Sequence, residues 1–430
     1  MCIIIPEVVE KCINRLSAAG FEAFVVGGCV RDSLIGRDPN DWDICTSALP
    51  EETKEIFKEY RIVDIGIAHG TVAVIFNKEN IEITTYRVEG EYKDNRRPEN
   101  VEFTSKVEDD LSRRDFTINA MAYNAERGLV DFFYGKEDLK EKVIRCVGEP
   151  NKRFNEDALR IMRAFRFAAQ LNYIIDSDTL MAIEENKMLL KNLSVERIAV
   201  ELNKLILSEE PERMIKLLFE MNIFSIIIEV IHNCNLKVDK IKNLTENCGQ
   251  IIRNCPQDLP IRLCILLNYI IEGYGVVDNS RDREGFEVEV ALIAEKILRG
   301  LRYDSNTIKE VSTLALYYHR NIPCNRVELK KILSLIDVEL FKKLIYMKDA
   351  MGKIRSREYI EMLKSIEINK ECFKIKDLKI NGKDLISLGA RNGKIIGDIL
   401  NVFLEMVIEN PEMNRRETLL ELGKNLIHCI

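Results

Sequence analysis

Two carboxylates lie two positions apart in the segment Asp41-Trp42-Asp43-Ile44-Cys45. The pattern predicts a strand over 42–45, in which side chains alternate between faces, so Asp41 and Asp43 would point the same way. Two like charges that close repel each other, and a shared divalent cation with oxygen preference relieves the repulsion. The pair is therefore a candidate magnesium site. A solvent-facing acid pair on an edge strand has the same spacing, so neighbouring residues must decide.

A glycine pair precedes these acids, in Val26-Gly27-Gly28 followed by Arg31. The order of residue types predicts a strand, a tight turn and a helix start. Glycine lets the backbone approach a phosphate, while helix-terminal N–H groups and Arg31 supply positive potential. A turn without a ligand would explain the glycines alone. Together with the two acids, they predict a site for the phosphates of a nucleotide.

Glu82 is a third candidate acid, because the flanking Ile81 and Ile83 go to one face of a predicted strand and Glu82 to the other. It would complete a triad of metal-site carboxylates with Asp41 and Asp43. An ordinary exposed strand glutamate follows from the same alternation. Both interpretations stay open at this point.

Length and composition indicate an ordinary globular protein. The chain has 430 residues, 46% of them apolar and 31% charged, which predicts two to four subdomains. The start lacks a basic segment and a long apolar run, and the apolar stretch 223–231 is short and contains Glu229, so we expect no signal peptide and no membrane span. Twelve scattered cysteines without CxxC spacing favour reduced thiols, and we expect a cytoplasmic protein.

The net charge of −7 argues against a nucleic-acid partner unless basic residues are locally concentrated. Such a concentration lies between 374 and 394. Its basic members are Lys374, Lys376, Lys379, Lys383, Arg391 and Lys394, against only Asp377 and Asp384. A basic patch on an acidic protein is therefore available for RNA.

The chain divides into an α/β part and a helical part. Short strands are predicted at 24–26, 42–45, 71–76, 81–86 and 101–103. After Gly135, apolar residues recur at helical spacing, as in Leu159, Met162, Phe165 and Ala169. The fold class is therefore α+β, with a mixed sheet first and an all-α remainder.

Ordered motifs over 21–205 resemble those of the class II tRNA nucleotidyltransferases, which comprise the CCA-adding enzymes and bacterial poly(A) polymerases of the polymerase-β-like superfamily. The matching stretches are Gly27-Gly28-x-x-Arg31-Asp32 with Asp41-x-Asp43, Arg113-Arg114-Asp115-Phe116-Thr117-x-Asn119-Ala120, Arg153-Phe154-x-Glu156-Asp157-x-x-Arg160-x-x-Arg163-x-x-Arg166, and Val195-Glu196-Arg197-Ile198. Ile380-Asn381-Gly382-Lys383-Asp384-Leu385 resembles the start of the tail in compact bacterial CCA-adding enzymes.

The resemblance implies four parts and a reaction. The parts would be a nucleotidyltransferase head (1–135), a nucleotide-selecting neck (136–205), a body (206–365) and a tRNA-binding tail (366–430). The reaction would be template-independent addition of CCA to the 3′ end of tRNA from CTP and ATP, by two-metal in-line transfer with Mg²⁺ and release of pyrophosphate. The resemblance leaves the oligomeric state open, as monomer or homodimer.

Each site residue would then have a role. Asp41 and Asp43 would hold the metal ions, and Glu82 would orient the attacking hydroxyl or accept its proton. The residues facing phosphates and ribose would be Gly28, Arg31, Arg114, Arg163 and Arg166.

Base choice is expected from Asp157 and Arg160. If Asn155 caps a helix, these two lie at i and i+3 on one face and form one recognition edge. Cytosine and adenine share an exocyclic amine beside a ring-nitrogen acceptor, which a carboxylate and a guanidinium would fit, whereas uracil and guanine present the opposite polarity. A surface salt bridge has the same spacing.

Several readings compete. The polar stretch 89–98 would be the mobile loop that such enzymes use to switch from C to A addition, or a plain connector. A poly(A) polymerase, or a relative adding only CC or only A, shares the catalytic residues. No histidine is followed by Asp, which argues against His-Asp phosphohydrolase activity. A non-catalytic RNA-binding protein is the alternative of a different class.

Overall fold

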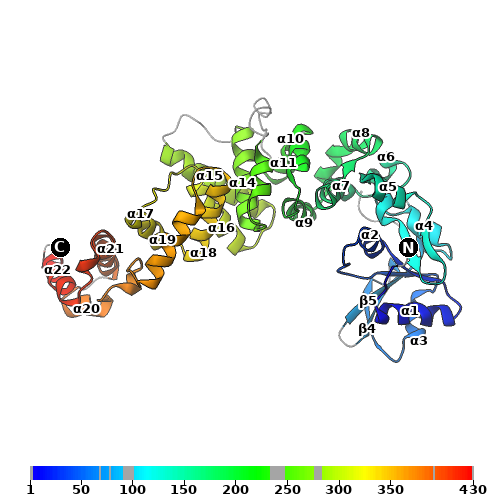
Figure 1. The fold of residues 1–430 in the computed structure, drawn as a ribbon, viewed down its shortest axis with the longest axis horizontal. Coiled ribbons are helices and arrows are strands. Elements are labelled where there is room, and N and C mark those ends of the chain that lie inside the picture. Colours follow the sequence, from blue (N-terminus) through cyan, green and yellow to red (C-terminus); the bar gives the residue numbers. More distant parts are fainter. Residues whose placement is uncertain are drawn as a thin grey trace. The chain divides into compact units, whose positions relative to one another are not determined.

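The computed structural model describes residues 3–66, 69–76, 79–90, 101–232, 247–275, 283–390 and 393–428 (Figure 1). Its internal contacts form two compact units. Unit 1 comprises Met1–Gly249 with Gly300–Arg302, and unit 2 comprises Gln250–Arg299 with Tyr303–Ile430. The finer division into head, neck, body and tail stays a prediction. Most of the predicted loop at 89–98 lies outside the described residues.

Unit 1 begins with a seven-stranded mixed sheet, ordered β3-β4-β5-β2-β1-β8-β9. The strands are β1 (Ala23–Val26), β2 (Ile44–Thr46), β3 (Arg61–Gly66), β4 (Thr71–Phe76), β5 (Glu79–Thr85), β8 (Met121–Asn124) and β9 (Gly128–Asp131). β2 pairs with β5 in parallel, and the other neighbours pair antiparallel. A separate ribbon joins β6 (Arg87–Glu89) to β7 (Val101–Phe103).

The strand β1 is buried along its whole length, because helices cover the sheet around it. Contacts to β1 come from α1 (Glu7–Ala18) and α2 (Gly28–Leu34), while α3 (Pro50–Ile56) contacts β4. Phe24 and Val26 share a core cluster with Leu111 of α4 (Val107–Ser112). The blue end of Figure 1 shows β4 and β5 with α1 and α3. This packing holds β1 in place, and the glycine pair follows directly after its last residue.

The rest of unit 1 is mainly helical. Its elements are η2 (Thr117–Asn119), α5 (Gly135–Glu141), β10 (Val143–Ile144), α6 (Pro150–Glu156), α7 (Leu159–Leu171), β11 (Ile174–Ile175), α8 (Ser177–Asn186), η3 (Lys187–Asn192), α9 (Val195–Ile206), α10 (Glu212–Glu220) and α11 (Ile223–His232). The helix α7 is buried on nearly every side and packs against α9 and α10. It therefore holds its side chains in a rigid setting.

Unit 2 is helical throughout its described part. After α13 (Cys248–Asn254), which spans the boundary, it contains α14 (Leu259–Gly273), α15 (Arg283–Gly300), α16 (Ser305–Tyr317), α17 (Arg326–Leu335), α18 (Val338–Ala350), α19 (Ser356–Ile368), η4 (Ile375–Asp377), α20 (Gly382–Ser387), α21 (Gly393–Glu409), η5 (Pro411–Met413) and α22 (Arg416–His428). The last helices enclose a small core of their own around Leu385, Phe403 and Leu419. Within the described ranges, none of the helices combines the length and apolar character needed to span a membrane.

The α+β class and the strands at 24–26, 71–76 and 101–103 are confirmed. One placement was wrong. The strand predicted over 42–45 begins only at Ile44, so Asp41 and Asp43 belong to the extended segment that leads into β2. The segment still follows the strand direction, because the backbone carbonyl of Asp43 accepts a hydrogen bond from the Val26 N–H at 3.0 Å.

Candidate active site

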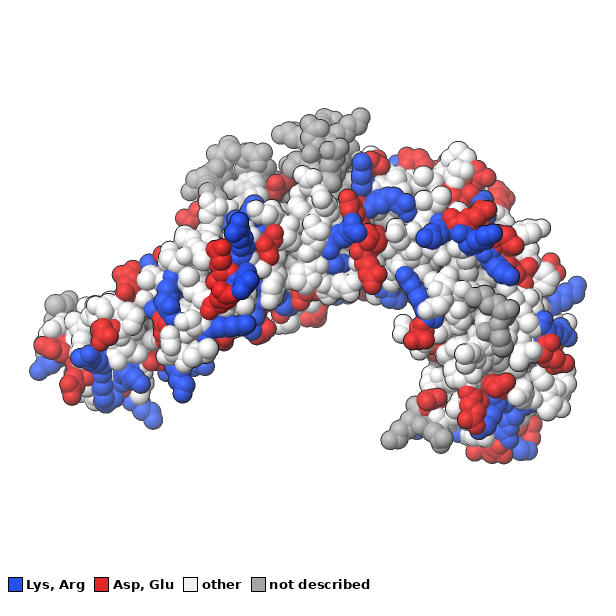
Figure 2. All heavy atoms as spheres, viewed as in Figure 1, with Lys and Arg blue, Asp and Glu red and all other residues white. Residues whose placement is uncertain are grey.

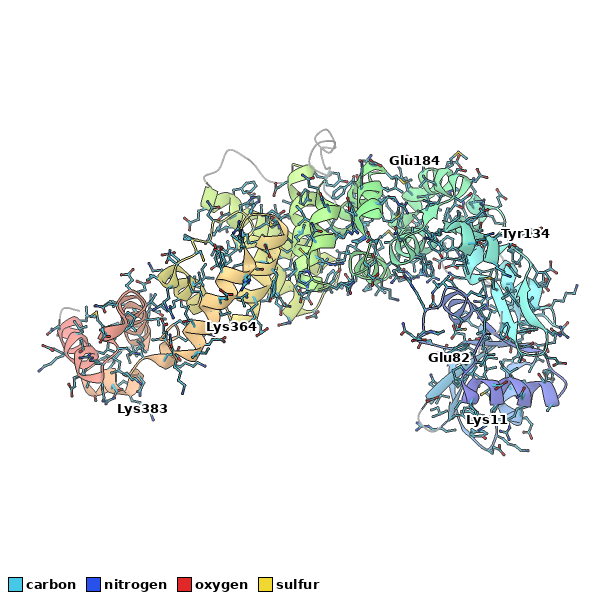
Figure 3. The ribbon with its side chains drawn as sticks, in the orientation of Figure 1. Lys11, Glu82, Tyr134, Glu184, Lys364 and Lys383 are labelled. Atoms are coloured by element: carbon cyan, nitrogen blue, oxygen red, sulfur yellow. The ribbon has the colours of Figure 1, made fainter. Side chains whose placement is uncertain are left out.

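The three predicted acids line one pocket of about 560 Å³ in unit 1. The parallel pairing of β2 with β5 explains why these acids lie together. Ile44 of β2 lies opposite Ile83 of β5, so the preceding positions bring Asp43 beside Glu82. Asp41 lies two residues before Asp43 and lines the same pocket. Figure 3 marks Glu82 in unit 1.

The pocket carries an excess of negative charge. Its described lining contains a fourth acid, Glu79, and neither Lys nor Arg. The protein packed around Asp43 raises the pKa of its carboxyl, Arg114 opposes that shift, and Asp41 adds to it. Burial also raises the pKa of Glu82, and the charges of Asp43 and Asp41 raise it further. Asp41 therefore makes ionisation of Asp43 less favourable, and both make ionisation of Glu82 less favourable.

This arrangement fits a divalent cation. A cation bound between the acids would offset both the burial and the repulsion that raise the pKa values of Asp43 and Glu82, and carboxylate oxygens are the ligands that Mg²⁺ prefers. Among the described residues, no three His, Cys, Asp or Glu side chains stand close enough to hold a metal by themselves. A cation here would complete its coordination with water and substrate phosphates, as Mg²⁺ commonly does.

The glycine turn lies next to Arg114. Gly27 has a φ of 80°, and Gly28 begins α2 as predicted. A Cβ added to Gly27 would lie 2.8 Å from Nη1 of Arg114, so the glycine makes room for the guanidinium. The Nε atom of Arg114 is buried and lacks a hydrogen-bond partner within the described structure. This turn therefore brings backbone and guanidinium together near Asp43. Burial lowers the pKa of Arg114, but Asp110 and, to a smaller extent, Asp43 raise it.

Arg114 is held by a chain of alternating charges. The fully buried Asp110 accepts hydrogen bonds from Arg114 at 3.3 Å and from Arg113 at 2.8 Å. Arg113 also donates to Glu89 at 3.0 Å, and Glu89 accepts from Arg87 at 2.8 Å. Burial opposes ionisation of Asp110, but Arg113 and Arg114 together lower its pKa. Alternation of this kind lets several buried charges coexist.

The sequence analysis missed Asp110, Glu89 and Arg113 as members of this chain. Arg113 and Arg114 stand in one motif, but only Arg114 was given a role. The spacing of Asp110 to Arg113 and Arg114, at three and four residues, was an available signal for local ion pairs. Glu89 gave no such signal, because it lies 24 residues from Arg113.

A second chain of contacts links α2 to α7. Arg31 forms a two-point ion pair with Asp32 at 2.8 and 2.9 Å and donates to the Asn119 side chain at 2.6 Å. Asn119 donates in turn to Asp115 at 3.1 Å, and Asp115 accepts from Arg163 at 2.5 and 2.8 Å. Arg31 and Arg163 are thus positioned by one continuous network.

Arg166 lies deeper than predicted for a phosphate ligand. Its side chain is 9% exposed and pairs with Glu201 of α9 at 2.5 Å. It also donates to Gln170 at 3.0 Å. Burial first, and the nearby Arg163 second, lower the pKa of Arg166. The structure therefore does not bring Arg166 to an open surface.

The predicted pairing of Asp157 with Arg160 on one helix was wrong. Asn155 lies inside α6 rather than capping a helix, and Asp157 has an extended backbone between α6 and α7. Its carboxylate accepts the Leu159 N–H at 3.0 Å and pairs with Arg197 of α9 at 2.9 Å. Asp157 thus accepts the first N–H of α7, whose N-cap is Ala158, and is also tied to α9.

Arg160 is buried and bound elsewhere. It pairs with Glu156 at 2.8 Å and donates to the backbone carbonyls of Arg113 and Arg153. Asp157 and Arg160 are thus close in sequence, but in the structure each side chain binds a different partner.

Three domain models match the chain. They describe the poly A polymerase head domain (residues 23–145), the RNA and SrmB-binding site of polymerase A (172–234) and tRNA nucleotidyltransferase domain 2 (288–422). A CCA-adding enzyme from Ligilactobacillus salivarius is 34% identical over 98% of each chain. One from Enterococcus faecalis is 35% identical over 96% of this chain and 94% of its own.

Solved structures agree in fold. The Bacillus stearothermophilus CCA-adding enzyme in complex with CTP has a TM-score of 0.79 and 27% identity, over 98% of this chain and 97% of its own. The Thermotoga maritima CCA-adding enzyme complexed with tRNA has a TM-score of 0.64 at 22% identity, over 99% and 97%. Together with the acid pocket, the glycine turn and the full-length relatives, these matches show that the chain belongs to the CCA-adding enzymes, the nucleotidyltransferases that add CCA to tRNA.

Proposed function

We propose that the chain adds all three nucleotides itself, from CTP and ATP, in a reaction that uses Mg²⁺. The observation that carries the proposal is the single pocket in which Asp41, Asp43 and Glu82 meet beside the glycine turn. An open, acid-lined site next to buried guanidinium groups suits a triphosphate that arrives with its cations.

Asp41 and Asp43 would hold the ions, since they are adjacent in the pocket and lack a cationic neighbour in its described lining. Bound Mg²⁺ would supply Lewis-acid activation of the RNA 3′-hydroxyl and neutralise the triphosphate. Glu82, whose raised pKa favours uptake of a proton, would orient that hydroxyl at its carboxylate. Arg114, beside Gly27, would stabilise charge on the phosphates.

Gly28 would let the backbone at the start of α2 approach a phosphate. Arg31 and Arg163 would direct their remaining N–H groups to phosphate and ribose, because each guanidinium has five donors and uses only some within the protein. Arg166 would act behind them through its pair with Glu201.

Asp157 and Arg160 would choose the base. A base that contacts Asp157 must compete with Arg197, and one that contacts Arg160 must compete with Glu156. Cytosine or adenine would compensate Arg160 and Asp157 for these lost contacts, because the base accepts a hydrogen bond from Arg160 and donates one to Asp157. Uracil or guanine would leave both side chains unsatisfied. Because binding must displace these internal ion pairs, only a base with matching hydrogen-bond groups should bind well.

The tail would contribute contacts to tRNA phosphates. Lys376, Lys379 and Lys383 are exposed. The two acids of this segment are engaged, since Asp384 pairs with Arg416 at 2.6 Å and Asp377 accepts the backbone N–H of Lys374 at 2.9 Å. Figure 2 shows Lys and Arg side chains gathered along this end of the molecule, and Figure 3 marks Lys383 there. Arg391 lies outside the described residues.

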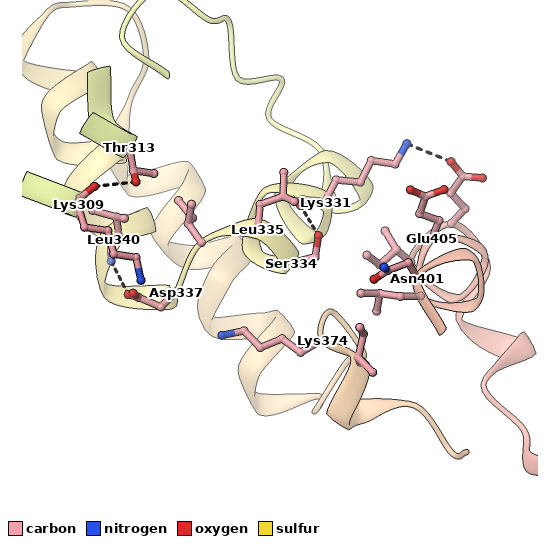
Figure 4. Close-up of a pocket in the computed structure, with 15 residues that line it drawn as sticks. Lys309, Thr313, Lys331, Ser334, Leu335, Asp337, Leu340, Lys374, Asn401 and Glu405 are labelled. Carbon is pink, nitrogen blue, oxygen red and sulfur yellow. Dashed lines mark hydrogen bonds and ion pairs between the residues drawn. The ribbon is translucent and has the colours of Figure 1, made fainter. Parts of the chain in front are cut away.

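A groove of about 910 Å³ lies next to this segment within unit 2. Lys309, Lys331 and Lys374 line it, and Lys331 reaches across to Glu409 at 3.0 Å (Figure 4). Acidic side chains, including Glu405 and Asp337, balance the lysines. The mixed charge makes the groove a weaker candidate for phosphate than the exposed tail lysines.

An incorporation assay tests the proposed reaction. Transcripts of tRNA that lack CCA, or that already end in CC, and a non-tRNA transcript are incubated with protein, Mg²⁺ and CTP, ATP or both. The proposal predicts three nucleotides on the first transcript, one A on the second and none on the third. A long A-tract on any RNA would favour a poly(A) polymerase, and addition of only CC or only A would show a specialised relative. Binding without incorporation would favour a non-catalytic protein.

Replacing Lys376, Lys379 and Lys383 by Ala tests the tail. We expect weaker tRNA binding and a salt dependence whose logarithmic slope falls by about 3, or about one per phosphate contact. A matched control replaces Lys11, Lys58 and Lys216, three exposed lysines of unit 1. An equal loss in both triple variants would show a general charge effect rather than a tail site.

A further inference from the structure

One aromatic ring lies among three guanidinium groups in unit 1. Phe167 of α7 is 5% exposed. The central guanidinium carbon of Arg166 lies 3.8 Å from the ring centroid, that of Arg31 lies 5.1 Å away and that of Arg163 lies 5.2 Å away. All three are within the distance at which a cation is attracted to the face of a ring.

The three cations come from two separate elements. Arg163 and Arg166 belong to the same helix as Phe167, whereas Arg31 extends from α2 after the glycine turn. The ring is therefore a point at which α2, which follows the glycine turn, meets α7. Phe116 packs edge-to-face with Phe167 at 5.8 Å between centroids.

Crowded cations need compensation. Each guanidinium has an acidic partner, which is Asp32 for Arg31, Asp115 for Arg163 and Glu201 for Arg166. The mutual effect of the cations persists, because Arg163 contributes, after burial, to lowering the pKa of Arg166. An aromatic face adds negative potential without adding a charged group that would compete with a phosphate for the guanidinium donors.

We propose that Phe167 is a positioning residue whose ring holds Arg31 and Arg163 in place for the triphosphate of the incoming nucleotide. The inference rests on the proposed function in one respect, namely that these arginines contact phosphate. Phe167 itself touches no substrate and acts through the guanidinium groups.

The same helix offers a matched comparison. Phe165 lies two residues earlier on α7 and is fully buried. Within the described structure, its ring has no guanidinium over it, unlike that of Phe167. A phenylalanine that only fills the core should therefore behave like Phe165, and one that holds cations should respond to the electron density of its ring.

Fluorinated phenylalanines separate these two roles, because fluorine withdraws electron density from the ring face while changing its size little. Mono-, di- and trifluorophenylalanine are introduced at 167 and, in parallel, at 165 of the full chain. The dissociation constants of CTP, ATP and pyrophosphate are measured by titration calorimetry, together with kcat and KM for incorporation into tRNA and with the unfolding temperature.

The proposal predicts a stepwise rise in the dissociation constants across the series at 167, reaching about 10-fold, since a desolvated cation–π contact changes an equilibrium by about 2- to 30-fold. KM should rise with it and kcat should change little, because the lost interaction binds ground state and transition state alike. The series at 165 should be flat. Two substitutions by natural amino acids test the same prediction. Phe167→Tyr should bind the nucleotides nearly as well as wild type, and Phe167→Leu should bind them more weakly.

A flat series at 167, or an equal decline at 165, would overturn the proposal. If the wild-type chain extends tRNA while the 167 series is flat, the role of Phe167 fails alone. If the wild-type chain binds neither CTP nor ATP, the proposed function fails and the role of Phe167 fails with it.

Discussion

The acids and the arginines of the candidate site are held in opposite ways. Asp41, Asp43 and Glu82 line an open pocket whose described lining supplies no cation, and burial first, with the neighbouring acids second, raises the pKa values of Asp43 and Glu82. The arginines are instead buried or half-buried and bound to acidic partners, as Arg163 is to Asp115. The acid side of the site thus depends on something that binds, whereas the arginine side is preorganised by the chain.

Because of this difference, we expect the acids to act mainly in the chemical step and the arginines mainly in nucleotide binding. An acid cluster that repels itself gains most from a cation, so its contribution should appear in the chemical step that the cation supports. A preorganised guanidinium loses little freedom when a phosphate arrives, so its contribution should appear in binding. Variants of the two groups should therefore differ in which kinetic constant they change.

The largest effect should follow Asp41→Ala. Loss of a metal-holding carboxylate should lower incorporation by about 10³-fold or more, since metal ions contribute several kcal/mol to such transition states. Labelled CMP incorporation into tRNA measures it, with unfolding temperature as the check on folding. Asp64→Ala is the matched control, because Asp64 is an exposed acid of β3 paired with Lys54 outside the pocket. Full activity of Asp41→Ala would refute the assignment of the metal site.

An intermediate effect should follow Asp115→Asn on the arginine side. Burial opposes ionisation of Asp115, but Arg163 and Asn119 outweigh it, and the pKa of the carboxyl falls from 3.8 to about 2. Because the folded-state pKa is lowered, the ionised group stabilises the protein above about pH 4, and this stability is lost as pH falls toward 2. The shift corresponds to about 2 kcal/mol.

Urea unfolding of wild type and Asp115→Asn at pH 6, 4 and 3 checks the sign. The difference in unfolding free energy should be largest at pH 6 and should shrink toward pH 3, because the carboxyl of the unfolded chain takes up a proton near pH 4 while that of the folded protein stays ionised until about pH 2. Asp64→Asn should show a small difference at every pH, because its ion pair is exposed. A difference for Asp115→Asn that grows on acidification would contradict the role of Asp115 as the anionic partner of Arg163.

The smallest effect should be a change in selectivity from Asp157→Asn. The amide keeps an oxygen for the Leu159 N–H but lacks the charge that prefers an exocyclic amine, so discrimination of CTP and ATP against UTP and GTP should fall about 10-fold. Competition of labelled CTP with UTP measures it. Arg37→Gln is a control, because Arg37 lies elsewhere in unit 1 and bonds the carbonyl of Gln170. Unchanged selectivity would remove Asp157 from base choice.

The sequence predicted the acids better than it predicted the helices α6 and α7. The Asp-x-Asp spacing and the alternation around Glu82 identified three residues that do share a pocket, because the alternation of side chains along an extended segment is a local property, although the pairing of β2 with β5 that brings the acids together is not. The break between α6 and α7 was missed, since neither Pro nor Gly marks it. Pro150, at the first position of α6, was the better signal for a helix start than Asn155.

The contacts between distant parts of the chain were beyond the reach of sequence patterns. Arg31 and Asn119 lie 88 residues apart, and Arg163 and Asp115 lie 48 apart, so only the tertiary fold joins them. The position of Phe167 among three guanidinium groups is hidden for the same reason, because an apolar residue on a buried helix predicts only core.

The division between chemistry and binding is tested most directly on a single variant, Asp43→Asn, by measuring CTP affinity and CMP incorporation on the same sample with Mg²⁺. The account predicts a CTP dissociation constant within a few-fold of wild type, because the arginine network is intact, and incorporation lowered by about 10³-fold. Incorporation near the wild-type rate would contradict it, and so would a loss of CTP binding as large as the loss of incorporation.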